Sequence, residues 1–341
     1  MRNFLTTEDH SQATLQALLD DAVELKRAPF QRRLADRSIA LLFFNPSLRT
    51  RTSFELGAHQ LGAKALILEP GKGAWPIELR DDVAMDGDAE EHVREAARVL
   101  SRYCDLIAVR AFPRFEDWAD DRKDRAIQQF SRHATVPVIN METIVHPCQE
   151  LALMLTLQER MGGAAGVVGK KFLLTWTYHP RPLNTAVANS ALMIAAKFGM
   201  EVTLLCPDER YLLDDRYMSA ARRSAADHGR TITVSHDLAA AYQGADVVYA
   251  KSWGALPFYG RWDEERPIRE RHRGFIVDAE KMARTRDAYF SHCLPVRREV
   301  KVTSEVLDGP RSLVIDEAEN RLHVQKAIMS ALCGVGPLAA T

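Results

Sequence analysis

A dense group of hydroxyl and guanidinium side chains follows the first strongly apolar run of the sequence. The segment Ser47-Leu48-Arg49-Thr50-Arg51-Thr52-Ser53 comes directly after the run Ser38–Phe44 and Pro46. A helix that begins here presents free backbone N–H groups and the positive end of its dipole, which favour a phosphate. Arginine adds a forked pair of donors that matches phosphate oxygens. The alternative is a capped helix with solvated arginines, but this density of donors favours phosphate binding.

Polar side chains also follow two later apolar runs in the first half of the chain. Arg110 ends one of them, and a buried arginine there needs an anionic partner. Glu142 follows the next, and His146-Pro147-Cys148-Gln149 then opens a helix. His146 and Gln149 lie three residues apart, on one face of the first turn. A structural ion pair and an ordinary histidine are the plainer interpretations, but a rim shared with Arg49 favours a site.

The second half of the chain repeats this arrangement. Polar or reactive residues follow three further apolar runs, at Trp176–Asn184, Lys251–Gly254 and Ser291–Pro295, and Arg321 opens the final helix after the acidic segment Asp316–Asn320. Each has a plainer interpretation. Trp176 can be a core residue, Lys251 a solvated surface lysine and Cys293 a small buried hydrophobe.

Several other chemistries lack their signatures. No GxGxxG follows an apolar run, which disfavours a dinucleotide site. No GxSxG elbow is present, and the segment Ala164–Lys171 lacks the first glycine and the hydroxyl residue of a phosphate-binding loop. The histidines, cysteines and carboxylates show no convincing metal spacing. We therefore expect neither a cofactor nor a metal.

The bulk composition limits the class of partner. The chain has 45 Lys and Arg against 46 Asp and Glu, whereas a protein that binds phosphate backbones usually has a basic excess. Its 5 cysteines are scattered, which argues against a disulfide framework. The first residues lack the apolar stretch of a secretory signal, and no apolar run is long enough for a membrane span. We expect a cytoplasmic enzyme with neither nucleic-acid nor membrane partners.

The elements that must position these residues alternate along the chain. We expect an amphipathic first helix that Pro29 ends, strands at 38–44, 65–69, 105–110 and 136–140, and helices at 51–62, 88–103, 114–133 and 147–161. Asp88 and Glu91 form a capping-box pattern for the helix at 88–103. In the second half we expect strands at 171–176, 201–206, 231–235, 246–250, 274–277, 288–292 and 312–315, and a helix at 317–333.

This alternation predicts the fold class. Continuously apolar strands between helices imply parallel sheets covered on both faces. The length of 341 residues suits two domains, and Gly162-Gly163-Ala164-Ala165-Gly166 is the strongest boundary signal. We therefore predict an α/β protein with two doubly wound parallel-sheet domains, at residues 1–161 and 162–316. Ligands bind beyond the carboxyl ends of the strands in such folds.

Together the motifs resemble the aspartate/ornithine carbamoyltransferase family over nearly the whole chain. The matching positions are Ser47-x-Arg49-Thr50-Arg51-Thr52, Arg110, His146-Pro147-x-Gln149 and His292-Cys293-Leu294-Pro295. The resemblance implies a carbamoyl phosphate-binding domain at 1–161, on which a helix at 317–335 packs back. It also implies an acceptor-binding domain at 162–316, with the active site in the cleft between the two.

The acceptor half departs from the ornithine-specific pattern. Ornithine enzymes of the family carry an aspartate and a Ser-Met-Gly loop that hold the free α-amine and carboxylate. This chain instead has Lys251-Ser252-Trp253-Gly254, then Val296–Lys301, and also Lys72–Pro76. These segments resemble the members that use N-acetylornithine, whose blocked α-amine carries no charge. The resemblance implies carbamoyl transfer to the δ-amine of N2-acetyl-L-ornithine, in arginine biosynthesis. Ornithine or N-succinylornithine as acceptor, and a non-catalytic phosphometabolite sensor, remain alternatives.

The same resemblance implies the role of each site residue. The carbamoyl phosphate-binding set is Ser47, Leu48, Arg49, Thr50, Trp75, Arg110, His146, Pro147, Cys148, Gln149, Cys293, Leu294 and Arg321. Within it, Arg110, His146 and Cys293 are the implied catalytic residues. The acetylornithine-binding set is Glu142, Lys251 and Leu294. The family forms homotrimers in which the loop of Trp75 reaches a neighbouring subunit's site, so the resemblance implies a homotrimer.

Two further positions follow from the resemblance. Glu90 stands where the members that use succinylornithine carry a neutral residue, and a glutamate there would repel a succinyl carboxylate. Its plainer role is stabilisation of a helix N-terminus. Lys301 matches a lysine that is a candidate for carboxylation.

Overall fold

A computed structural model describes residues 2–336, and the chain divides into two compact units. Unit 1 consists of Met1–Arg114, Ala119–Leu151 and Asn320–Thr341, and unit 2 of Phe115–Trp118 and Ala152–Glu319. Two helices, α6 (Pro147–Met161) and α14 (Val314–Leu332), have residues in both units. The domain limits expected from the sequence stay predictions.

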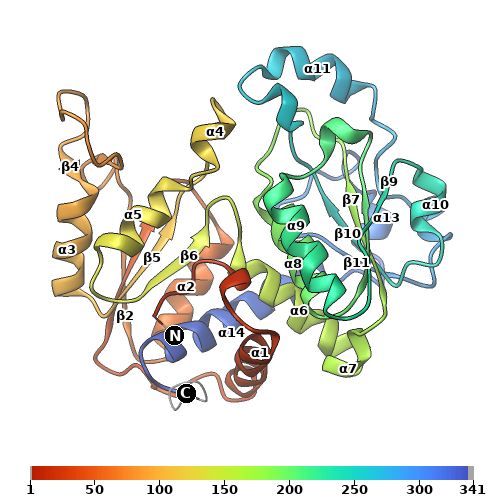
Figure 1. Cartoon of the computed structure of the whole chain (residues 1–341). Helices are drawn as coiled ribbons and strands as arrows, with labels where there is room; N and C mark the ends of the chain where they lie inside the picture. Colours follow the sequence, from red (N-terminus) through yellow and green to blue (C-terminus); the bar gives the residue numbers. More distant parts are fainter. Residues whose placement is uncertain (1, 337–341) are drawn as a thin grey trace. The chain divides into compact units, whose positions relative to one another are not determined.

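Unit 1 contains six strands and the helices that cover them (Figure 1). The strands are β1 (Ser38–Phe43), β2 (Lys64–Leu68), β3 (Ile77–Glu78), β4 (Glu91–His92), β5 (Leu106–Arg110) and β6 (Val138–Glu142). The further helices of this part of the chain are η1 (Thr7–Asp9), α1 (Gln12–Arg27), α2 (Arg49–Gln60), α3 (Val93–Tyr103), α4 (Trp118–Asp121) and α5 (Arg125–His133).

The main sheet of unit 1 is doubly wound. Its strand order is β2-β1-β5-β6, and each neighbouring pair is parallel. The chain extends from β1 to β2 on one side, then crosses back to place β5 on the other. Right-handed crossovers in opposite directions put their helices on opposite faces. The order of the strands therefore reverses between β1 and β5.

Helices cover both faces of this sheet. Residues of α3 and α5, among them Ala97 and Phe130, are buried against apolar side chains of β1 and β5. α1, α2 and α14 pack together by contacts of Lys326, whose Nζ donates to Leu25 O at 2.9 Å and to Gln60 Oε1 at 2.8 Å. Burying one large apolar side chain contributes about 1.5–3 kcal/mol. These two helix layers hold the sheet in place and thereby the residues at its strand ends.

Unit 2 is built around a second sheet. Its strands are β7 (Lys171–Trp176), β8 (Glu201–Leu205), β9 (Thr233–Ser235), β10 (Val247–Lys251) and β11 (Tyr289–Ser291). Its helices are α7 (Ala164–Val167), α8 (Ala186–Lys197), η2 (Glu209–Tyr211), α9 (Asp215–Ala226), α10 (Leu238–Tyr242), η3 (Leu256–Phe258), α11 (Trp262–Glu270), α12 (Ala279–Met282) and α13 (Ser304–Leu307).

This sheet is doubly wound as well. Its order is β11-β10-β7-β8-β9, again with parallel neighbours throughout. The chain runs outward from β7 through β8 to β9, then returns to place β10 on the other side of β7. The order reverses between β7 and β10. The predicted class, α/β with two doubly wound parallel sheets, is confirmed.

A short segment of unit 2 comes from between two stretches of unit 1. Phe115–Trp118 belongs to unit 2, although the residues on both sides of it belong to unit 1. The indole N–H of Trp262 donates to Phe115 O at 2.8 Å, and that of Trp118 donates to Asp214 Oδ2 at 2.7 Å. These two bonds hold the segment to α11 and to the residue that caps α9.

Two expected strands of the second half are wrong. Val277 forms only an isolated bridge with Val302, and Ser312 only one with Phe290. The final helix begins at Val314 and includes the second half of the segment expected as the last strand. A short apolar run cannot be assigned to strand or buried helix by periodicity alone. Arg321 consequently lies inside this helix and does not open it.

Two expected helices of the first half also need correction. The helix expected at 88–103 begins at Val93, and His92 caps it by accepting from the Arg94 N–H at 3.2 Å. The capping box is wrong because Glu91 pairs with Ile77 in the small β3–β4 sheet. The helix expected at 114–133 is split into α4 and α5 at Asp124, whose φ of 50° is left-handed.

None of the helices within residues 2–336 has the length and apolar character needed to cross a bilayer.

Candidate functional site

The carboxyl ends of β1 and β5 meet where the strand order of unit 1 reverses. Phe43, the last residue of β1, pairs in register with Arg110, the last residue of β5. The loops that follow two such strands leave toward opposite faces, and the crevice between them is the usual ligand site of a doubly wound sheet. β1 leads to the segment Ser47–Thr50. The structure therefore brings the predicted phosphate segment and Arg110 to the same edge.

A β-bulge at this edge aligns Arg110 with Glu142. β5 and β6 pair in regular register up to Val109 and Asn140, and the register then shifts so that Arg110 lies opposite Glu142. Without the shift, Met141 would be its partner. Bulges change the direction of a side chain and are common beside active sites.

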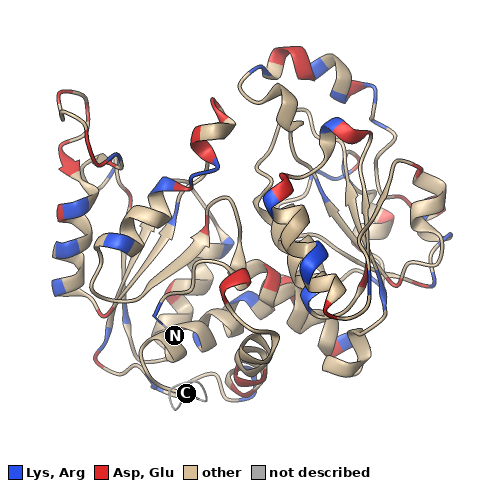
Figure 2. Cartoon of the chain, viewed as in Figure 1, with Lys and Arg blue, Asp and Glu red and all other residues tan. Residues whose placement is uncertain are grey.

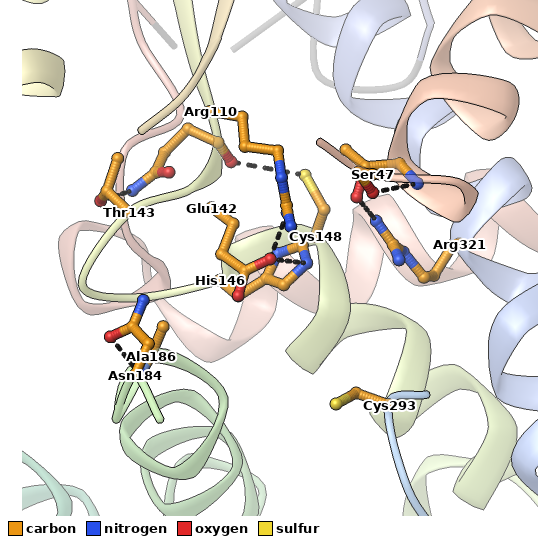
Figure 3. Close-up of polar contacts among 12 residues, drawn as sticks. Ser47, Arg110, Glu142, Thr143, His146, Cys148, Asn184, Ala186, Cys293 and Arg321 are labelled. Carbon is orange, nitrogen blue, oxygen red and sulfur yellow. Dashed lines mark hydrogen bonds and ion pairs between the residues drawn. The ribbon is translucent and has the colours of Figure 1, made fainter. Parts of the chain in front are cut away.

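Glu142 holds both a buried arginine and a buried histidine (Figure 3). Arg110 Nη1 donates to Glu142 Oε2, and His146 Nε2 lies 3.4 Å from the same oxygen. Arg110 Nη2 also lies 3.5 Å from Pro46 O. The family resemblance implies that Glu142 binds the acceptor. In the structure, the Glu142 carboxylate contacts Arg110 and His146 and so orients these two side chains. The acceptor assignment of Glu142 stays a prediction.

The start of α2 is linked to α14. Ser47 Oγ accepts from the Thr50 N–H at 3.1 Å, and Thr50 Oγ1 accepts from Arg321 Nη2 at 2.5 Å. Thr50 and Arg321 are buried, whereas Leu48 is 76% exposed and Arg49 is half-buried. A residue far along the chain thus reaches the predicted phosphate segment (Figure 3).

This edge of unit 1 favours an anion. Burial lowers the pKa of Arg321 to about 10, and the positive charges of Arg110 and Arg49 also lower it, while Glu142 opposes the shift. The buried Nε–H groups of Arg110 and Arg321 have no hydrogen-bond partner within residues 2–336. A buried donor without a partner costs about 1–3 kcal/mol. An oxygen-rich anion would satisfy such donors.

The first turn of α6 supplies the other predicted residues of unit 1. Pro147 begins the helix, where its missing N–H costs nothing. Gln149 is 2% exposed. Cys148 is fully buried, and burial raises the pKa of its thiol to about 12. Its thiol therefore stays protonated at neutral pH, which rules out a nucleophilic thiolate there.

Trp75 and Glu90 lie in the segment between β2 and α3, which Figure 2 shows as rich in acidic residues. Trp75 is 68% exposed and lines an apolar groove of about 520 Å³ with Leu68 and Val99. Glu90 is also exposed. In the described part of the chain, no hydrogen bond or ion pair joins either residue to Arg110 or Arg321. The structure of unit 1 does not place Trp75 or Glu90 beside Arg110 and Arg321.

The second reversal point, in unit 2, carries the predicted acceptor residues. Lys251 ends β10 and pairs in register with Trp176, the last residue of β7. Lys251 Nζ donates to Cys293 Sγ at 3.5 Å, and Cys293 is 7% exposed. These two predicted residues are therefore brought together.

Leu294 has an unusual backbone conformation. Its φ is 53°, in the left-handed region, and its N–H donates to His292 Nδ1 at 2.8 Å. A left-handed conformation costs a residue other than glycine about 1–2 kcal/mol. The surrounding structure must therefore hold Leu294 in this conformation.

Positive charge also accumulates in unit 2. Lys301 is 2% exposed, and burial lowers its pKa to about 7, with Lys251 and Arg297 lowering it further. His179 Nε2 accepts from Arg297 Nε at 3.0 Å, and burial lowers the pKa of His179 to about 4. The site assignments from the sequence missed His179 and Arg297. The only available signal was their position, His179 after β7 and Arg297 after Leu294.

Two family profiles match the chain. The one described as "Aspartate/ornithine carbamoyltransferase, carbamoyl-P binding domain" matches residues 2–159, and the one described as "Aspartate/ornithine carbamoyltransferase, Asp/Orn binding domain" matches residues 178–332.

Individual relatives are similar over nearly their full length. A protein of Xanthomonas campestris pv. campestris, named N-acetylornithine carbamoyltransferase, is 61% identical, with 98% of each chain covered. One of Bacteroides fragilis, named N-succinylornithine carbamoyltransferase, is 37% identical, with 94% of this chain and 95% of the relative covered. A crystal structure of acetylornithine transcarbamylase complexed with acetylcitrulline superposes with a TM-score of 0.96 at 60% identity, covering 99% of this chain and 100% of the other.

Proposed function

The chain belongs to the aspartate/ornithine carbamoyltransferase family, and we propose that it transfers the carbamoyl group of carbamoyl phosphate to the δ-amine of N2-acetyl-L-ornithine. The products are N-acetyl-L-citrulline and phosphate. The observation that carries this proposal is the 61% identity, over 98% of both chains, to a protein named for this acceptor. The relative named for succinylornithine is only 37% identical. Arginine biosynthesis is the proposed setting.

In unit 1, the proposed phosphate ligands are Ser47, Leu48, Arg49, Thr50 and Arg321. The N-terminus of α2 supplies backbone N–H groups and a favourable dipole. The unpartnered Nε–H of Arg321 and the local excess of guanidinium groups support the same assignment.

Arg110 and His146 are the proposed donors to the carbamoyl oxygen. Glu142 already binds both side chains, so neither must reorganise when negative charge develops on that oxygen. Preorganised donors of this kind are often the largest catalytic contribution, and losing one costs roughly 100- to 1000-fold in rate. Gln149 and the Leu294 carbonyl are the proposed partners of the carbamoyl nitrogen, and Pro147 and Cys148 are further proposed members of the carbamoyl phosphate-binding set.

In unit 2, Lys251 and Leu294 are the proposed acceptor ligands, with Cys293 near the δ-amine; Glu142 is proposed as a further contact. The attacking amine must be neutral, although an alkyl ammonium has a pKa of about 10.4. The positive charges of Lys251 and Arg297, which lower the pKa of Lys301, also favour the neutral form of an acceptor amine nearby. The nitrogen lone pair forms the new C–N bond, the C–O bond to phosphate breaks, and the departing phosphate takes the proton.

We also propose that Lys301 can be carboxylated. Because burial lowers its pKa to about 7, a substantial fraction of its amine is neutral at physiological pH. That amine can add to CO₂ with loss of one proton, which places a carbamate among Lys251 and Arg297. Intact-mass spectrometry in bicarbonate should show one added CO₂ that Lys301→Met abolishes. An unmodified wild-type mass under those conditions would contradict this.

The proposed assembly is a homotrimer in which Trp75 reaches a neighbouring site. The 68% exposure of Trp75 beside an apolar groove supports a contact with another subunit. Cytoplasmic location stays a prediction.

Ureido-product formation from carbamoyl phosphate tests the function, with N-acetylornithine, ornithine and N-succinylornithine offered separately. We expect strong product with N-acetylornithine alone. Product mainly from ornithine or succinylornithine would keep the chemistry and contradict the acceptor. Carbamoyl phosphate binding without product from any of the three would favour a sensor.

A further inference from the structure

We infer that the buried ion pair Glu265–Arg269 positions the two loops of unit 2 that carry the acceptor-binding residues. This inference rests on the proposed function, which assigns Lys251 to the acceptor. Both side chains of the pair lie on α11, above the sheet of unit 2 in Figure 1. Glu265 is fully buried and Arg269 is 2% exposed.

The contacts of the pair reach two different loops. Glu265 Oε2 binds Arg269 Nη1, while Glu265 Oε1 accepts from the Tyr211 hydroxyl at 3.1 Å and lies 3.5 Å from the Ala255 N–H. Arg269 Nη2 donates to Pro180 O at 3.3 Å. Ala255 belongs to the loop after β10, and Pro180 to the loop after β7. The ion pair therefore bridges the two loops that flank the reversal point of the sheet.

These loops are also tied to each other. Thr177 N–H donates to Lys251 O at 2.9 Å, and Gly254 N–H donates to Leu183 O at 3.2 Å. An added Cβ on Gly254 would lie only 2.6 Å from the Trp262 ring of α11, so only glycine fits there. The loops and α11 consequently form one packed assembly, in which a shift of the ion pair moves both loops.

Each loop carries groups of the proposed acceptor site. Pro180 follows His179, whose ring accepts a hydrogen bond from Arg297. Ala255 lies four residues after Lys251, whose amine donates to Cys293. Replacing a buried ion pair by apolar residues is often neutral for stability. The contacts of this pair go to loop backbone and to a tyrosine rather than to the sheet, which points to positioning of the loops.

Arg269→Lys separates positioning from folding. A lysine keeps the charge pairing with Glu265 but lacks the second arm of the guanidinium that reaches Pro180 O. A small displacement of binding groups can cost up to about 100-fold. We expect the KM for acetylornithine to rise roughly 10- to 100-fold. The affinity for carbamoyl phosphate, measured by calorimetry, should stay within about twofold, because all the proposed ligands of its phosphate group lie in unit 1.

Arg266→Lys is the matched control. Arg266 lies on the same helix and pairs with Asp263, but these side chains are 60% and 90% exposed. It should behave as the wild type in both measurements. The double variant Glu265→Gln/Arg269→Met removes both charges and tests the same point without leaving one of them unpaired. It should fold, bind carbamoyl phosphate and still show the raised KM for acetylornithine.

Unchanged acetylornithine kinetics in both Arg269→Lys and the double variant would overturn the inference. So would a parallel loss of carbamoyl phosphate affinity, since that indicates general disruption. A wild-type protein that forms no product with acetylornithine would instead overturn the proposed function, before any variant is compared.

Discussion

At the scale of single side chains, one carboxylate interacts with the buried arginines of unit 1, Arg110 and Arg321. Glu142 binds both Arg110 and His146, and it is the acidic residue that opposes the lowered pKa of Arg321. It leaves the group with net positive charge. The guanidinium groups of Arg110, Arg321 and Arg49 outnumber this carboxylate, which suits a dianionic phosphate better than a neutral ligand.

Arg49→Ala tests the phosphate assignment. A hydrogen bond to a charged group contributes about 1.5–3 kcal/mol, so we expect the KM for carbamoyl phosphate to rise by one to two orders of magnitude. Thermal stability should change little, because Arg49 is only half-buried. Arg51→Ala is the control, since Arg51 pairs with Glu69 at 3.3 Å instead. Equal effects of the two variants on carbamoyl phosphate kinetics would refute the assignment.

Glu90→Ala tests discrimination between acceptors. If the Glu90 carboxylate repels a succinyl carboxylate, its removal should raise kcat/KM for succinylornithine relative to acetylornithine, by roughly 5-fold or more for about 1 kcal/mol of repulsion. Asp88→Ala removes an equal charge two residues away, in the same exposed segment, and should leave the ratio alone. A ratio that is constant across the wild type and both variants would remove repulsion as the explanation.

At the scale of elements, the sites follow from strand order, which the sequence predicts only in part. Apolar runs followed by polar residues identify the strand ends, and hence Arg49, Arg110 and Lys251. They do not show that β1 and β5, or β7 and β10, are the neighbours at each reversal. That depends on pairing between distant segments. The bulge opposite Glu142 has no local signal either, because one extra residue leaves the apolar pattern intact.

Lys326→Met tests how α14 is fixed to α1 and α2. Burial lowers the pKa of Lys326 from 10.5 to about 8 in the folded protein. Between these values the unfolded chain binds the proton more tightly, so wild-type stability falls as the pH drops from 10.5 to 8 and then stays lowered. The methionine variant has no such pH-dependent loss of stability. As the pH falls from 10.5 to 8, its unfolding free energy should therefore rise relative to that of the wild type, by on the order of 3 kcal/mol.

Urea unfolding at several pH values between 7 and 10.5 measures this difference. Lys64→Met is the control, because Lys64 is exposed on β2. If the difference in unfolding free energy between Lys326→Met and wild type does not vary with pH, the pKa of Lys326 is not lowered in the folded protein and the prediction is wrong.

At the scale of the whole molecule, each unit brings its own set of ligands to its own reversal point. In the proposed function, the arginines of unit 1 bind the anion, while Lys251 and Cys293, which contact each other in unit 2, face the acceptor amine. The proposed assembly adds a third contribution, Trp75 from a neighbouring subunit. A site composed of several chains makes a quantitative prediction for mixed oligomers.

Trp75→Ala and Arg49→Ala should complement each other. At carbamoyl phosphate concentrations near the wild-type KM, each variant alone should have little activity, since every site lacks one of the two residues. In a cyclic oligomer assembled at random from equal amounts, about a quarter of the sites combine an intact Arg49 with an intact Trp75 from the neighbour. Co-refolding the two variants should therefore restore about a quarter of wild-type activity. Activity that stays at the sum of the separate variants would contradict a shared site.

The interleaving of the two units along the chain has a consequence for how such proteins can be recombined. A gene that is cut within the Gly162–Gly166 segment gives two fragments, and neither encodes a whole unit. The N-terminal fragment lacks the part of α14 that carries Arg321 and Lys326. The C-terminal fragment lacks Phe115–Trp118, which bonds to Trp262 and Asp214. Exchanging one unit for that of a relative would need crossovers at all the junctions, after residues 114, 118, 151 and 319. Inheritance as one block, with acceptor preference changed by point substitutions in the loops, is the simpler evolutionary route.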